Sequence, residues 1–172
     1  MRSLKIDHEV LVDLTSQTME QMDKQELSWA LHTLDFLWAS MDVHVRVVRS
    51  SLFPAILNAR RDRFGRAGIP AYDEARDVIA RLQADHDFFM IELEESVAAL
   101  RKIRKHAEDN QSLLVQLRER ISKFAARLLT HRDEEEVVHQ WPRRLLQPSE
   151  LTDLQTIVRH KSQEVPVRFA SA

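Results

Sequence analysis

The sequence predicts an all-α protein, and three observations support this. Only two glycines and one tyrosine occur among the 172 residues. The long stretches between the few prolines are rich in Leu, Ala, Glu, Arg and Gln, which favour helices. Along these stretches apolar residues recur alternately three and four positions apart, as they do on one face of an α-helix. A sheet protein would need more turn residues than this chain contains.

Two helices are expected before the only long loop. The first covers about residues 4–22 and the second about residues 27–60. Within the second, Leu52-Phe53-Pro54 predicts a kink, because proline lacks the backbone N–H donor and crowds the preceding turn. The loop covers residues 64–70, where both glycines and a proline occur.

Two long helices and a short terminal helix are expected after this loop. Residues 72–106 form the third helix, and a polar turn at residues 108–110 leads to the fourth, which is stopped by Trp141-Pro142. Ser149 is expected to be the N-cap of a short helix that ends near His160.

The composition limits the kinds of site that the chain can form. With 172 residues it is one ordinary domain, large enough to fold by packing alone. It has no cysteine, which excludes disulfides, thiolate catalysis, iron–sulfur clusters and zinc-finger sites. Any bound metal must therefore be held by His, Asp or Glu.

Charge and hydropathy give expectations about partners and compartment. The formal net charge is −2, which argues against a general attraction to nucleic acid. Residues 1–9 contain no apolar segment typical of a signal peptide, and no uncharged apolar run is long enough to cross a bilayer. We therefore expect a cytoplasmic protein with no nucleic-acid or membrane partner.

A histidine stands on the apolar face of each of the four long helices. On the fourth, His131 and Glu135 are four residues apart within an otherwise apolar stripe, so both side chains leave the same face. The other three are His8, His44 and His86. A single inward histidine is usually a hydrogen-bonded core residue, so none of these alone predicts a ligand.

Distances along the chain indicate that the four histidines fall in one layer. In an antiparallel arrangement, residues of neighbouring helices share a height when they are equally far from the turn between them. Each consecutive pair of these histidines meets that condition to within about one helical turn. Four polar side chains at one level of a core are costly unless something binds them together. A metal ion does so, and we therefore predict a metal site.

The order of these residues resembles the hemerythrin-like family of HHE cation-binding domains. The resemblance rests on one histidine, then a histidine followed by Leu52-Phe53-Pro54, then Ala84-Asp85-His86, and finally His131 and Glu135 with a run of acids. Each piece is common, but their ordered spacing is fairly specific.

The resemblance implies a fold, a domain division and a cofactor. It implies an up-down-up-down four-helix bundle that holds a non-haem di-iron centre, with histidines as end ligands and two carboxylates bridging the irons. On this basis residues 1–146 form the hemerythrin-like four-helix bundle, and residues 147–172 form a short C-terminal helix and a loose tail.

Residue by residue, the resemblance predicts a ligand set with one gap. The second bridging carboxylate should stand four residues after His44, where Val48 cannot ligate a metal. Because bridging anions make two neighbouring cations tolerable, this loss should weaken the second iron most. The expected cofactor is iron, as a single ion or as a pair bridged by Glu135 and solvent.

Met90 also replaces a histidine of the oxygen-carrying members, which disfavours a reversible oxygen carrier. The residues that match metal ligands are His8, His44, His86, His131 and Glu135.

Other polar residues near these positions are assigned different roles. Asp85 and Asp87 flank His86 but point about 100° away from it, so we expect them behind the ligands or at the surface. His139 lies one turn beyond Glu135, but it is near a helix end, where we expect exposure. Surface positions are also expected for His32, His106 and His160.

Three classes of function follow from this interpretation. The leading one is an iron-binding protein that binds or senses dioxygen, nitric oxide, or iron or redox state, since histidine and carboxylate ligands with open positions suit Fe(II). The alternative is a degenerate, metal-free helical bundle that acts through protein–protein contacts. A ferritin-like oxidase would need a Glu-x-x-His motif on each of two helices, and only Glu136 with His139 fits. The sequence thus favours binding over catalysis, and leaves a homodimer open.

Overall fold

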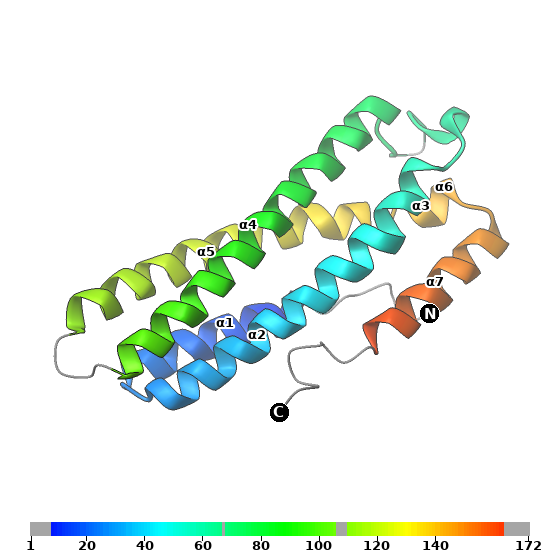
Figure 1. Cartoon of the computed structure of the whole chain (residues 1–172). Helices are drawn as coiled ribbons and strands as arrows, with labels where there is room; N and C mark the ends of the chain where they lie inside the picture. The colour runs from blue at the N-terminus through cyan, green and yellow to red at the C-terminus, as the bar shows by residue number, and fades with distance from the viewer. Residues whose placement is uncertain (1–7, 67, 106–109, 164–172) are drawn as a thin grey trace. The chain divides into compact units, whose positions relative to one another are not determined.

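The structure, a computed structural model, describes residues 8–66, 68–105 and 110–163, and over these residues it is helical without a strand, as predicted (Figure 1). Within the same ranges no helix has the length and apolar character that crossing a bilayer would need. The elements in chain order are α1 (His8–Asp23), α2 (Leu27–Val47), the π-helix η1 (Val48–Leu52), α3 (Phe53–Leu57), the 3₁₀ helix η2 (Arg61–Arg63), α4 (Tyr72–Lys105), α5 (Gln111–Val138), α6 (Pro142–Leu145) and α7 (Pro148–Ser162).

The predicted interruption before Pro54 is confirmed, and it takes the form of a π-helical turn. Figure 1 shows α2, η1 and α3 following one another without a loop. Pro54 has no N–H to donate to the preceding turn, and the Phe53 N–H bonds to the carbonyl of Val48, five residues back instead of four. The extra residue in this turn changes the angular register of the chain that follows it.

The C-terminal helix is also confirmed, but its predicted N-cap was wrong. The helix α7 begins at Pro148, and its N-cap is Gln147 rather than Ser149. Proline suits the first helical position because its fixed φ matches the helix and its missing N–H is not needed there. The Gln147 backbone N–H donates to the Glu150 carboxylate at 2.6 Å, which completes a capping box. The predicted start near residue 4 and the tail lie outside the described residues.

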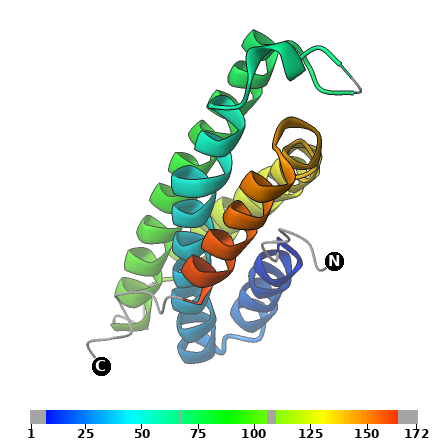
Figure 2. The same cartoon turned by 90° about the vertical axis from the view of Figure 1, so that its right-hand side faces the viewer.

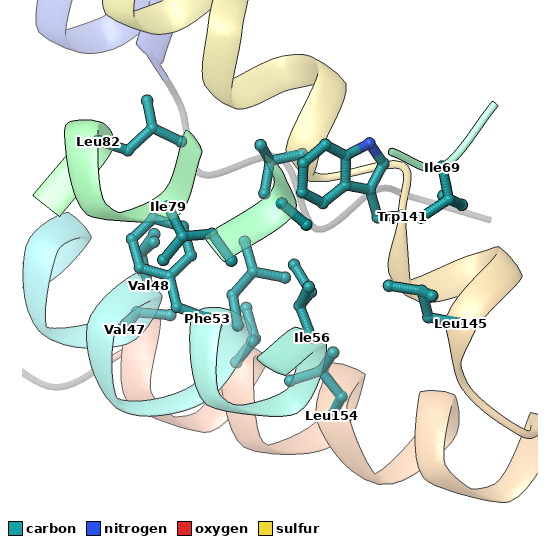
Figure 3. Close-up of a cluster of buried hydrophobic side chains, with 14 of the residues drawn as sticks. Val47, Val48, Phe53, Ile56, Ile69, Ile79, Leu82, Trp141, Leu145 and Leu154 are labelled. Carbon is teal, nitrogen blue, oxygen red and sulfur yellow. The ribbon is translucent and has the colours of Figure 1, made fainter. Parts of the chain in front are cut away.

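The described chain forms two compact units, and the first has an apolar core built around η1 and α3. It comprises residues 43–66, 68–86 and 131–163. Figure 2 shows α7 alongside the run of η1 and α3, and α6 contacts both α3 and α7. Figure 3 shows part of this core, whose buried residues are Val47, Val48, Leu52, Phe53, Ile56, Phe64, Ile69, Ala75, Ile79, Leu82, Val138, Trp141, Leu145, Leu154 and Val158. Each such buried side chain contributes about 1.5–3 kcal/mol of hydrophobic stabilisation.

The second unit comprises residues 8–42, 87–105 and 110–130. Segments of α1, α2, α4 and α5 form it. The rings of Phe89 and Phe124 pack edge to face in it, with centroids 5.2 Å apart. The helices α2, α4 and α5 each contribute residues to both units.

Candidate metal centre

Four histidines of the first unit gather around one buried carboxylate, and we call these five residues the Glu135 cluster. Three helices supply them: α2 near its end, α4 near its middle, and α5 with the turn that follows it. Their positions on apolar stripes carry them inward, and all five are buried. The members are His44, His86, His131, Glu135 and His139.

The two oxygens of Glu135 face different pairs of histidines. Its Oε2 atom lies 3.2 Å from Nε2 of His44 and 3.3 Å from Nε2 of His131. Its Oε1 atom lies 3.7 Å from Nε2 of His86 and 3.8 Å from Nε2 of His139. The Nε2 atoms of His44 and His86 are 3.2 Å apart. One carboxylate therefore stands among four imidazole nitrogens.

These separations suit donor atoms that share a metal ion. Two donors that bind one ion through bonds of about 2.1 Å lie about 3.0 Å apart at a right angle and about 3.4 Å apart at a tetrahedral angle. Charge-assisted N–H···O hydrogen bonds are shorter, at about 2.7–2.9 Å. The contacts of Oε2 with His44 and His131 fall in the range expected for a shared ion.

Asp85 fixes the orientation of the His131 ring. An oxygen of Asp85 lies 3.2 Å from Nδ1 of His131. A carboxylate can only accept a hydrogen bond, so the ring proton of His131 is at Nδ1 and the lone pair of Nε2 faces Glu135. Two acceptor atoms then face each other 3.3 Å apart. A cation between them, either a second proton or a metal ion, makes that contact favourable.

His86 is held neutral by its surroundings, as a metal ligand must be. Burial lowers the pKa of His86 from 6.5 to about 2, and the neighbouring His44 and His131 add to this, although Glu135 opposes it. The Phe53 ring stacks on the imidazole, with an interplanar angle of 15° and centroids 5.9 Å apart. A neutral imidazole keeps a lone pair on one ring nitrogen, as a metal ligand requires.

His8, the remaining predicted ligand, opens α1 and belongs to the second unit, where it is buried. Four buried residues, His8, His44, His131 and Glu135, are of the types that could hold a metal ion. All members of the Glu135 cluster belong to the first unit. A role for His8 as a ligand stays a prediction from the sequence.

The sequence analysis missed one member of the cluster, His139, and placed the residues near the cluster with mixed success. His139 was expected to be exposed, and this was wrong: its exposed fraction is 6%. Its spacing, four residues after Glu135, was the available signal. Asp85 contacts a histidine of the cluster, and that histidine is His131 rather than the adjacent His86. Asp87 is exposed. Of the other histidines, His32 and His160 are exposed as predicted, and His106 lies outside the described residues.

Comparison with protein-family models, with curated proteins and with solved structures finds no match to this chain.

Proposed function

We propose that this chain is a hemerythrin-like iron-binding protein that binds or senses dioxygen, nitric oxide, or the cellular iron or redox state. The observation that supports this most strongly is the arrangement of Asp85, His131 and Glu135. It turns an imidazole lone pair toward a buried carboxylate oxygen 3.3 Å away. A divalent cation placed there is attracted by both groups.

A metal ion accounts for the cluster better than protons do. A buried negative charge costs several kcal/mol unless a positive charge compensates it. Protonating one histidine would compensate Glu135, but burial penalises a charged imidazole and neighbouring histidines add to that penalty, as the lowered pKa of His86 reflects. A metal ion brings the positive charge while every imidazole stays neutral and donates a lone pair.

Iron is proposed from the donor set. Two histidines and one carboxylate, here His44, His131 and Glu135, form the combination that suits non-haem Fe(II) with open positions. When bound, such an ion would supply a coordination position for a small ligand such as dioxygen or nitric oxide. The chain's own residues hold the ion, orient its ligands through Asp85 and exclude bulk water by burial.

The first test is metal content per chain after anaerobic reconstitution with Fe(II) and removal of loosely bound ions. The wild-type chain should retain iron, and Glu135→Gln should lose most of it. Glu136→Gln makes the same chemical change one residue along, about 100° around the helix, and should retain iron like the wild type. A wild-type chain without iron, or equal retention in both variants, would refute the metal assignment and favour a metal-free helical protein.

Nitric oxide tests the second part of the proposal. Added to the anaerobic Fe(II) protein, it should change the absorption and electron paramagnetic resonance spectra. Spectra that stay unchanged while iron remains bound would refute the small-ligand function and leave iron binding intact.

A further inference from the structure

His139 is buried just after the end of α5, where the helical path continues one residue past Val138. Its backbone N–H donates to the Glu135 carbonyl at 2.9 Å, as in a regular helical turn. The chain then turns at Trp141 into α6, and both Trp141 and Leu145 are buried in the core of the first unit. Where a helix end is normally exposed, this end is covered.

The four-residue spacing on both sides of Glu135 explains why its two oxygens have different neighbours. His131 lies one turn before it and His139 one turn after it, on nearly the same face. His131 meets Oε2 and His139 meets Oε1. The carboxylate therefore spans the gap between two histidines of its own helix, while α2 and α4 bring one further histidine to each side.

We propose that His139 is a metal ligand, which together with His86 and Oε1 of Glu135 completes a position for the second ion of the pair that the resemblance to the hemerythrin-like family implies. The proposal rests on the iron site proposed above, and it makes Glu135 a bridge between two ions. His139 thereby provides a ligand that the resemblance to the hemerythrin-like family did not supply.

The distances around Oε1 are compatible with an ion. Separations of 3.7 Å to His86 and 3.8 Å to His139 correspond to angles of about 120–130° at an ion with bonds of about 2.1 Å. Such angles are those of a trigonal arrangement, which leaves room for solvent ligands. The two histidines come from separate segments of the first unit, His86 from α4 and His139 from the turn after α5.

The second ion should bind more weakly than the first. His131 is oriented by Asp85, whereas Nδ1 of His86 is buried without a hydrogen-bond partner in the described part of the chain. The positive charge of Arg49 also disfavours further positive charge at His86. Repulsion between two ions across one carboxylate acts in the same direction. Binding should therefore occur in two distinguishable steps.

Anaerobic titration with Fe(II) alone, followed by metal analysis, tests the proposal on the full chain. The wild type should bind two ions, in a tight and a weak step. His139→Gln should keep the tight step and lose the weak one, or weaken it at least tenfold. His32→Gln, which changes an exposed histidine, should behave like the wild type. Two unchanged steps in His139→Gln, or a single step in the wild type, would overturn the second position.

Two further measurements separate the possible failures. Substituting Mn(II) for iron should give an electron paramagnetic resonance spectrum of two coupled ions in the wild type and of isolated ions in His139→Gln. Isolated ions in both would overturn the bridge. His139→Leu removes the nitrogen while keeping the site apolar, and it should lose the same step if His139 is a ligand and not only a folding element. If the wild type binds no metal, the proposed function itself fails. If Glu135→Gln loses metal while His139→Gln binds metal like the wild type, only the proposal for the second position fails.

Discussion

Asp85 should control the affinity of the metal site without touching the metal. Its carboxylate lies 3.2 Å from Nδ1 of His131, and 17% of its side chain is exposed. It does two things: it holds the ring so that Nε2 faces Glu135, and its negative charge makes that nitrogen a better donor. Asp85→Asn keeps an acceptor oxygen and removes the charge, whereas Asp85→Ala removes both.

The expected magnitude follows from these two roles. Loss of a group that orients a metal-bound histidine weakens metal binding by about 10–100-fold. We therefore expect about tenfold weaker Fe(II) binding in Asp85→Asn and about 100-fold in Asp85→Ala. A tenfold loss removes about 1.4 kcal/mol of the stabilisation by metal. For a chain of this size that lowers the gain in Tm on adding metal by about 3–6 °C.

The assay is a competition between the protein and a chelator of known affinity, with thermal unfolding as a second readout. Asp87→Asn is the matched control, because Asp87 flanks His86 on its other side and is exposed. Its affinity should equal that of the wild type. Equal affinities of Asp85→Ala and Asp87→Asn would refute the assigned role of Asp85. A large loss of stability of Asp85→Ala without metal would show that its contact is structural.

Two more predictions concern the metal-free protein and the missing carboxylate. The pKa of His86 is lowered to about 2 in the folded state. Below about pH 6.5 His86 therefore gains a proton in the unfolded chain but stays neutral in the folded one. Unfolding of the metal-free protein by urea should therefore become easier by about 1.4 kcal/mol per pH unit as the pH falls from 6.5. His86→Phe should remove that slope and His32→Gln should keep it; an equal slope in all three would contradict the burial of a neutral His86. Val48→Glu should destabilise the metal-free protein by at least about 2 kcal/mol, because Val48 lies in the apolar core. It should also gain more stability from added Fe(II) than Val48→Gln does, and an equal gain would show that residue 48 cannot reach a metal.

Sequence pattern was sufficient to predict the long helices and every member of the Glu135 cluster except His139. The spacing of apolar residues depends on helix geometry alone, so the sequence predicted α1, α2, α4, α5 and a C-terminal helix. Pro54 predicted the interruption for a similar reason, since a missing N–H acts within one turn. The alignment of His131 with Glu135 is likewise a property of one helix.

What lies between helices was predicted less well. Asp85 points away from its neighbour His86, and only the packing of α4 against α5 within the first unit brings it to His131. His139 is buried where the chain turns at Trp141 into α6, and Trp141 and Leu145 there belong to the apolar core of the first unit. Neither fact can be read from spacing along one helix, because each depends on which surface a distant segment covers.

The sequence by itself therefore determined the fold class, the residue types of the candidate site and the helix face on which each of them lies. The tertiary structure decided which oxygen of Glu135 faces which histidine, and that His139 is among them. The physical reason is that helical periodicity fixes directions within a helix, whereas distances of 3–4 Å between side chains of different helices are fixed only when those helices pack.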